Sequence, residues 1–227
     1  MKPTTVVITG TDTEVGKTWV GAALARASAQ AGWTTVAIKP VESGCSPMPS
    51  PGEDGALLAE ATGQQAPRQA LTRLALPVAP PVAADVAGVT LDADAWLAQV
   101  HRYTREAAVV WVEGAGGLLS PLTWTMTALD LALALEAMVV VVSANRLGTL
   151  NHTLLTLEVL RAHHLHVAGV VLNQTTPLDR TADASRPSNA ASLARIAPAV
   201  QLLQTPHVDH WDALVPVVAP VLDWLER

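Results

Sequence analysis

The chain has 227 residues, half of them apolar, so it can build a substantial core and is not globally disordered. Its formal net charge of −6 argues against a basic nucleic-acid-binding surface, and its single cysteine excludes an internal disulfide. No apolar stretch is long enough to cross a bilayer. We therefore expect a cytoplasmic protein that binds neither nucleic acid nor a membrane and forms a single domain over residues 1–227.

The first predicted element is a buried strand over residues 4–8, followed by a glycine-rich loop and a helix over residues 18–31. This order of strand, glycine loop and helix is the context of a phosphate-binding P-loop. Five residues separate Gly10 from Gly16, whereas the standard motif has four. A simple glycine turn before a helix is therefore the alternative to nucleotide binding.

The placement of Gly16, Lys17 and Thr18 favours the nucleotide-binding interpretation. Lys17 would reach the outer phosphates from the loop, and the Thr18 hydroxyl beside it would contact Mg²⁺. Lys39 follows a second predicted strand, residues 34–38, and ligands of open parallel sheets bind at the carboxyl ends of strands. Lys39 could therefore stabilise charge during phosphoryl transfer, and a solvated surface lysine is the alternative.

Two carboxylates are candidate metal ligands. Glu113 follows the predicted strand over residues 108–112 and precedes a glycine-rich segment, so it could hold Mg²⁺ beside the P-loop. A dinucleotide fingerprint is excluded there, because Leu119 stands where a third glycine or alanine belongs. Asp54 precedes a short helical stretch, and a helix-start or surface role is its alternative.

The remaining chain continues the alternation of strands and helices. Further strands are predicted over residues 138–142 and 167–172, and further helices over residues 92–105 and around residues 150–160. The strands are apolar without alternation, which is typical of strands buried on both faces. The sequence thus predicts an α/β fold with a mostly parallel sheet and helices on both faces. Three segments are predicted to be loops or irregular, namely residues 47–52, 77–81 and 175–189.

Two asparagine-containing loops follow the later strands. Asn151 could contact a ligand or simply cap a helix, and Asn173-Gln174 could contact a base or form a turn.

Four motifs together resemble the dethiobiotin synthetase family: GTDTEVGKT at residues 10–18, KPVESG at 39–44, VEGAGG at 112–117 and LGTLNH at 147–152. The lengthened P-loop is the form that this family carries. The resemblance implies an ATP- and Mg²⁺-dependent cyclo-ligase of biotin biosynthesis, working as a homodimer with its substrate site at the interface. It would convert 7,8-diaminopelargonic acid and CO₂ into dethiobiotin, ADP and phosphate, through a carbamate and a carbamic–phosphoric anhydride.

The resemblance also implies roles by position. Lys17 and Lys39 would be catalytic, and the metal ligands would be Thr18, Asp54 and Glu113. The implied ATP contacts are Glu14, Val15, Gly16, Lys17, Thr18, Glu113, Gly114, Ala115, Gly116, Asn173, Gln174, Pro206, His207 and Val208. The implied substrate contacts are Thr13, Ser43, Pro80, Gly116, Leu147 and Asn151, the last in the neighbouring subunit.

Other functions fit parts of the pattern. A nucleotide-switched ATPase of the partitioning type shares the sheet and P-loop, but such proteins carry a lysine early in the loop, where this chain has Gly10-Thr11-Asp12. A ligase acting on a large corrinoid-like acid would carry a glutamine-hydrolysing domain, which this chain does not contain. A nucleotide-binding module without turnover is the third alternative.

Overall fold

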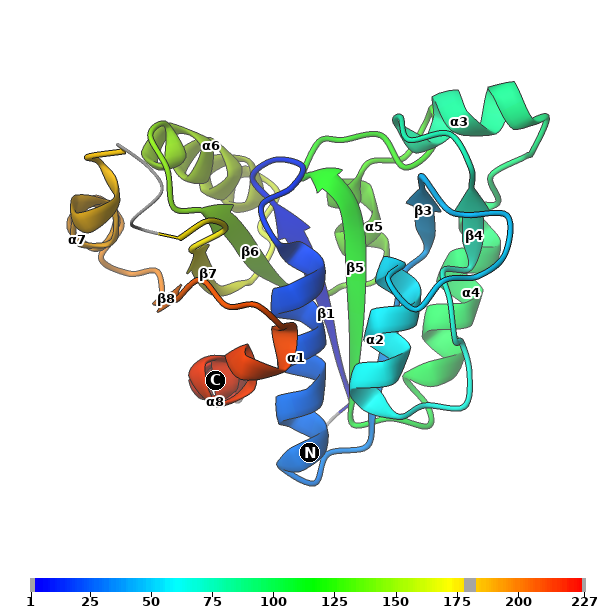
Figure 1. Cartoon of the computed structure of the whole chain (residues 1–227), viewed down its shortest axis with the longest axis horizontal. Coiled ribbons are helices and arrows are strands. Elements are labelled where there is room, and N and C mark those ends of the chain that lie inside the picture. The colour runs from blue at the N-terminus through cyan, green and yellow to red at the C-terminus, as the bar shows by residue number, and fades with distance from the viewer. Residues whose placement is uncertain (1–2, 178–182, 226–227) are drawn as a thin grey trace.

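A parallel six-stranded sheet forms the centre of the molecule, with its strands in the order β2-β5-β1-β6-β7-β8 (Figure 1). The structure is a computed structural model and describes residues 3–177 and 183–225. The strands of this sheet are β1 (Thr4–Gly10), β2 (Thr35–Ile38), β5 (Val109–Gly117), β6 (Met138–Ala144), β7 (Val167–Asn173) and β8 (Leu202–Thr205). A separate two-stranded parallel sheet pairs β3 (Val41–Ser43) with β4 (Thr72–Leu74).

Helices cover both faces of the main sheet. They are α1 (Lys17–Gln30), α2 (Asp54–Thr62), α3 (Pro80–Ala87), α4 (Ala93–Tyr103), α5 (Ala128–Ala134), α6 (Thr149–Ala162), α7 (Arg186–Ile196) and α8 (Val215–Val218). Short 3₁₀ helices, Trp211–Leu214 and Ala219–Leu225, flank α8. Of the helices that the structure describes, none is both long and apolar enough to span a membrane.

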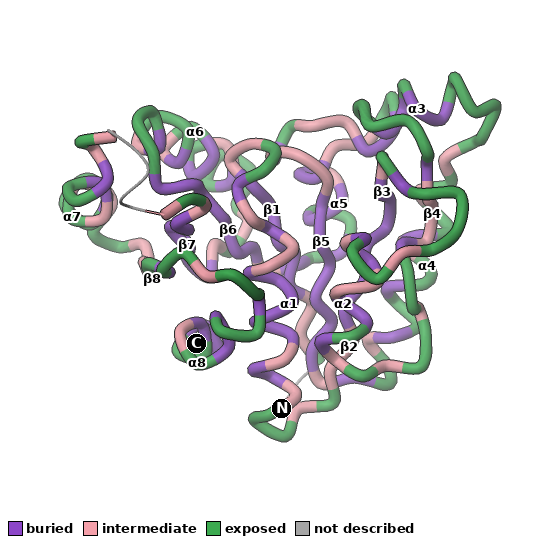
Figure 2. Tube along the Cα trace, viewed as in Figure 1, coloured by how far each residue is buried: buried purple, intermediate pink, exposed green. Residues whose placement is uncertain are grey.

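The strands have continuous apolar runs because helices cover both faces of the sheet. In β1, Val6 and Ile8 pack in the cluster formed with α1, α2 and the C-terminal segment, whereas Val7 packs in the cluster formed with α3, α4, α5 and α6. Successive side chains of a strand point to opposite faces, so a strand that is covered on both faces needs apolar residues at every position. Figure 2 shows the strands as a buried interior surrounded by more exposed helices and loops.

The strand order reverses at β1, which has β5 on one side and β6 on the other. Ligands of open α/β sheets bind in the crevice outside the carboxyl ends of the strands at such a reversal. The glycine loop that follows β1 lies at this point, with the carboxyl ends of β5 and β6 beside it (Figure 1).

The fold class predicted from the sequence is confirmed, as are the five predicted strands and the helices at the P-loop, at residues 92–105 and at residues 150–160. Glu113, however, lies inside β5 rather than after it, because β5 continues through the glycines to Gly117. The strands β3, β4 and β8 were not predicted, because they are short and lack the run of β-branched residues that marked the equally short β2.

Two predicted loops are partly helical. Pro80 and Pro81 form the first turn of α3, where proline is tolerated because the N–H it lacks would have no helical partner. The end of the predicted loop 175–189 belongs to α7, which begins at Arg186. Residues 178–182 of this segment lie outside the described residues.

The C-terminal segment packs on α1 and reaches β7. A Cβ atom added to Gly169 of β7 would lie 2.4 Å from the ring of Trp224, so the indole occupies the space that a larger residue would need. Trp224 is buried in the same apolar cluster as α1. The segment therefore completes the cover of one face of the sheet.

Candidate active site

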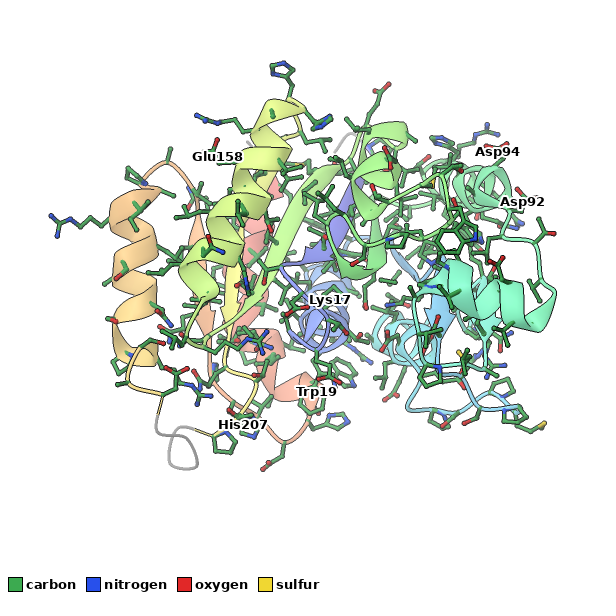
Figure 3. All side chains as sticks on the ribbon, turned by 90° about the horizontal axis from the view of Figure 1, so that it is seen from above. Lys17, Trp19, Asp92, Asp94, Glu158 and His207 are labelled. Atoms are coloured by element: carbon green, nitrogen blue, oxygen red, sulfur yellow. The ribbon has the colours of Figure 1, made fainter. Side chains whose placement is uncertain are left out.

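The loop after β1 delivers a lysine to the start of α1. Lys17 is only 7% exposed, and its Nζ donates a hydrogen bond to the backbone oxygen of Asp12 over 3.1 Å. Burial lowers the pKa of Lys17, against the opposing effect of the Glu113 carboxylate. Viewed onto the carboxyl ends of the strands, Lys17 and Trp19 lie near the middle of the molecule, while Asp92 and Asp94 lie at its periphery (Figure 3).

Gly16 and Asn173 hold the loop in place. Gly16 adopts a φ of +88°, and a Cβ atom there would lie 2.1 Å from Asn173 Nδ2. That amide nitrogen donates to the backbone oxygen of Val15 over 2.9 Å, while Thr205 Oγ1 donates to Asn173 Oδ1 over 2.6 Å. In this structure Asn173 thus braces the P-loop against β8, and its implied contact with adenine stays a prediction.

A cluster of charges lies beside the loop, in which Lys39 and Glu113 are buried and Asp54 is partly exposed. Lys39, which follows β2, places Nζ 2.6 Å from Glu113 Oε1 on β5 and 2.8 Å from Asp54 Oδ2 at the start of α2. Thr18 Oγ1 donates to the same Glu113 oxygen over 2.9 Å. Four elements distant in the sequence therefore bring one cation, two carboxylates and a hydroxyl together.

The cluster perturbs the titration of its members. Burial opposes protonation of Lys39, but the carboxylates of Glu113 and Asp54 outweigh it and raise the pKa of the lysine. Burial raises the pKa of Glu113, and the charge of Lys39 partly offsets this rise. Burial alone would raise the pKa of Asp54, but Lys39, Thr18 and Lys17 together outweigh it and lower that pKa. Lys39 is therefore a cation near neutral pH, which suits it to contact anionic oxygens.

The donor set of this cluster fits Mg²⁺. Thr18, Asp54 and Glu113 offer only oxygen atoms, which this ion prefers. Glu113 Oε2 is buried and has no hydrogen-bond partner among the described residues. A buried carboxylate oxygen without a partner is costly, and a cation or a ligand would satisfy it.

A cavity of about 710 Å³ opens over the cluster. It brings together most of the predicted site, namely Thr13, Glu14, Gly16, Lys17, Thr18, Lys39, Ser43, Asp54, Pro80, Glu113, Ala115 and Gly116. Ser43 Oγ is buried and has no hydrogen-bond partner in the described part of the chain. The cavity is large enough for a small molecule beside a phosphate chain.

Other predicted residues lie elsewhere. Gln174, Pro206 and His207 line a second hollow of about 500 Å³ beside β8. Figure 3 shows His207 on one side of the P-loop helix. The further residues Val15, Gly114, Asn173, Val208, Leu147 and Asn151 line neither hollow. Leu147 and Asn151 are both exposed, so this chain alone does not bring them to the charge cluster.

Sequence reasoning missed nine residues that line the main cavity, and two of them, Trp19 and Glu42, lie within or beside the predicted motifs. Trp19 follows Thr18 in the first turn of α1, and its place directly after the Gly-Lys-Thr motif was the available signal. Glu42 lies within the KPVESG motif between Lys39 and Ser43, but its partners are backbone groups of α2, which no sequence pattern identifies.

Comparison with known proteins identifies relatives over most of the chain. A family model described as an AAA domain matches residues 4–207. A protein of Anaeromyxobacter dehalogenans (strain 2CP-1) named ATP-dependent dethiobiotin synthetase is 44% identical over 191 residues, covering 83% of each chain. A Caulobacter sp. (strain K31) protein of the same name is 38% identical over 226 residues, covering 94% of this chain and 95% of its own.

Solved structures share the fold at lower identity. A Cyanothece McdA variant in complex with ATP matches with a TM-score of 0.61 at 12% identity, covering 99% of this chain and 96% of its own. Chloroplast FtsY from Physcomitrella patens matches with a TM-score of 0.55 at 20% identity, covering all of this chain and 66% of its own. At these identities the likeness shows the α/β architecture alone.

Proposed function

Because the chain belongs to the dethiobiotin synthetase family and is therefore an ATP-dependent ligase of biotin biosynthesis, we propose that its cavity at the carboxyl ends of the strands is the site of that reaction. The substrates are 7,8-diaminopelargonic acid, CO₂ and ATP, and the products are dethiobiotin, ADP and phosphate. The observation that carries the proposal is that Lys17, Lys39, Asp54 and Glu113 line one cavity.

The chemistry needs few reactive side chains. One substrate amine adds to CO₂ and loses a proton, which gives a carbamate. A carbamate oxygen attacks the γ-phosphorus of ATP, so that ADP leaves and a carbamic–phosphoric anhydride forms. The second amine then attacks the carbonyl carbon and expels phosphate, closing the cyclic urea. The carbamate is already an anionic nucleophile, so the phosphoryl step needs positioning and charge neutralisation rather than a strong general base.

The two lysines supply that neutralisation. Burial lowers the pKa of Lys17, and the nearby charge of Lys39 lowers it further. Both line the cavity, so they can contact the same phosphate chain. Mg²⁺ held by Thr18, Asp54 and Glu113 would add further positive charge at the phosphate oxygens. The partnerless hydroxyl of Ser43 supports a substrate contact.

The rest of the site extends in two directions. Glu14 to Thr18 and Glu113 to Gly116 surround the phosphates, while Gln174 and the segment Pro206 to Val208 contact the nucleobase side, with Asn173 beneath them. Thr13, Ser43, Pro80 and Gly116 contact the substrate. Leu147 and Asn151 reach the substrate of a second copy of the chain, which explains why they are exposed here.

The functional protein is a homodimer of single ATP-binding domains, each formed by residues 1–227. It works in the cytoplasm and binds neither nucleic acid nor a membrane.

The decisive experiment measures ADP release with and without diaminopelargonate and bicarbonate, together with mass-spectrometric detection of the cyclic urea. We expect ADP release to require both substrates and to match product formation. Hydrolysis that DNA or a protein partner stimulates, without any cyclic urea, would instead support the nucleotide-switched ATPase.

A further inference from the structure

The N-terminus of α2 is capped by a residue from another element. Both carboxylate oxygens of Glu42 on β3 accept backbone hydrogen bonds there, Oε1 from the N–H of Asp54 over 2.6 Å and Oε2 from the N–H of Gly55 over 3.0 Å. The residue at the N-cap position, Glu53, makes no such side-chain bond in the described structure. Glu42 therefore satisfies two donors that a helix usually pairs through its own cap.

Glu42 bonds the first turn of α2, and this turn contains Asp54, a proposed metal ligand. Asp54 is the first residue of α2, and its side chain lies 2.8 Å from Lys39 Nζ. Glu42 is only 8% exposed and comes three residues after Lys39. The backbone N–H of Asp54 is thus fixed by Glu42, and the Asp54 side chain by Lys39.

The backbone at Ala70 packs closely against the first turn of α2 and limits where the helix can begin. A Cβ atom on Gly55 would lie 2.1 Å from the backbone nitrogen of Ala70, so the first turn of α2 packs directly against the backbone at Ala70. With Glu42 holding the N–H groups and residue 70 packed against Gly55, the position of Asp54 is set by tertiary contacts rather than by α2 alone.

From these contacts we infer that Glu42 is a positioning residue for the metal site, holding Asp54 where its carboxylate can bind Mg²⁺ together with Glu113. The inference rests on the proposed function, in which Asp54 is a ligand. Residues that orient metal ligands without touching the metal commonly affect metal affinity or activity by about 10- to 100-fold. Glu42 acts through Asp54.

A carboxylate holds the two N–H groups at the start of α2 better than the neutral amide of a glutamine would. It has two strong acceptor oxygens, one for each N–H, and its charge complements the positive N-terminal end of the helix. Burial raises the pKa of Glu42, while the hydrogen bonds from Gly55 and Asp54 oppose that rise. In a glutamine one of the two acceptor oxygens is replaced by an NH₂ group, a donor that would face the second N–H instead of accepting from it.

A separate metal site at Glu42 is a weaker interpretation. Potential ligand atoms of Glu42, Cys45 and Glu53 lie within 4.8 Å of one another. Both oxygens of Glu42 already bond α2, however, and both oxygens of Glu53 bond Arg73. Binding a metal at this cluster would require breaking these bonds.

The test compares Glu42→Gln and Glu42→Ala with the wild-type chain. Mn²⁺ affinity is measured by electron paramagnetic resonance in the presence of a non-hydrolysable ATP analogue, and the Mg²⁺ dependence of dethiobiotin formation is measured in parallel. We expect Mn²⁺ to bind about 10-fold or more weakly to both variants. We also expect saturating Mg²⁺ to restore most of kcat. A merely structural role would lower the melting temperature without changing metal affinity.

Glu53→Gln is the matched control, since Glu53 is equally buried, adjacent to Asp54 and subject to the same change from carboxylate to amide. Its bonds go to Arg73 and the N–H of Ser46, so we expect lower thermal stability and unchanged Mn²⁺ affinity. Equal weakening in Glu53→Gln and Glu42→Gln would overturn the inference. Should both Glu42 variants fail to fold, the Mn²⁺ affinity of Glu42→Asp is compared with that of the wild type and of Glu53→Gln. The shorter aspartate side chain can retain one of the two bonds to α2.

Asp54→Asn separates this inference from the proposed function. If Asp54→Asn weakens Mn²⁺ binding and Glu42→Gln does not, Asp54 remains a ligand and the positioning role of Glu42 is rejected. If Asp54→Asn leaves Mn²⁺ binding unchanged, the proposed metal ligand and the inference fail together.

Discussion

Two charged residues near the carboxyl ends of the strands, Lys39 and Glu113, are buried. Lys39 and Glu113 are 3% and 1% exposed, so neither charge is stabilised by bulk water. A buried charge is tolerated when it is paired and hydrogen-bonded, and Lys39 has Glu113, Asp54 and the backbone oxygen of Gly114 as partners. This arrangement holds a cation ready for an anionic ligand, because little reorganisation is needed when the ligand arrives.

Lys39→Ala tests whether that cation serves catalysis. We expect ATP binding to persist through the P-loop while turnover falls by about 10²- to 10³-fold, the usual loss when one aimed donor is removed. Calorimetric titration with an ATP analogue and steady-state product formation measure the two properties. Turnover near the wild-type rate would reject a catalytic role for Lys39.

Gly16→Ala tests the close approach of the P-loop to Asn173. The substitution places a methyl group 2.1 Å from Asn173 Nδ2 at a φ of +88°, so the loop must shift and ATP affinity should fall at least 10-fold. Gly32→Ala is the matched control, because Gly32 has a φ of +86° but no atom within 4 Å of the added carbon in the described structure. We expect this control to lose some stability and to keep its ATP affinity.

At the scale of elements, the small β3–β4 sheet is joined to α2 and to the loop before it. Glu42 on β3 bonds the N–H groups of α2, and Arg73 on β4 forms an ion pair with Glu53 just before the helix. Arg73 also donates to the backbone oxygen of Ser46. The loop between β3 and α2 is therefore fixed at both ends by charged side chains.

Glu53→Gln should weaken this attachment in a pH-dependent way. Hydrogen bonds from Arg73 lower the pKa of Glu53, so the pair stabilises the folded chain above the unfolded pKa of about 4.3. That contribution is lost as the pH falls through the lower folded value. We expect the variant to lose about 1 to 2 kcal/mol at pH 7 and to approach the wild type near pH 3. Urea unfolding at both pH values measures this, and an equal loss at both would contradict it.

At the scale of the whole molecule, the proposed dimer would extend the site beyond one copy of the chain. The residues around the cavity come from the P-loop, from α1, α2, α3, β3 and β5, and from loops beside them, all in the first 121 residues. Leu147, just before α6, and Asn151, in the first turn of α6, are exposed. A closed dimer with twofold symmetry would give each cavity the missing α6 residues in a reciprocal way.

Complementation between defective subunits tests this arrangement. If Asn151 acts in the partner's site, Lys39→Ala and Asn151→Ala copies, co-expressed with different tags, form mixed dimers in which one site is intact. Random pairing of the two copies should then restore about a quarter of wild-type activity. Co-expression of Lys39→Ala with Lys17→Ala should restore nothing, because both lysines belong to the same site. No gain with Asn151→Ala would place that residue outside the partner's site.

The order of elements and most of the nucleotide site could be predicted from the amino-acid sequence. Apolar runs without alternation predicted strands buried on both faces, and the glycine loop with Lys17 and Thr18 predicted the position of the P-loop. Those features are local, because burial pattern and turn geometry depend on neighbours in the chain. Lys39 and Glu113 could be assigned to the same end of the sheet because parallel strands bring their carboxyl ends together.

Only the tertiary structure decided which of these groups touch. The bonds from Glu42 to α2, from Asn173 to the P-loop and from Arg73 to Glu53 join residues 12, 158 and 20 positions apart. Partners at such separations are chosen by the packing of elements, and the same side chains would form a turn or a solvated surface in another fold. The sequence alone therefore determined the elements and their chemistry, while their packing decided how far each charged group is buried and which partner it has.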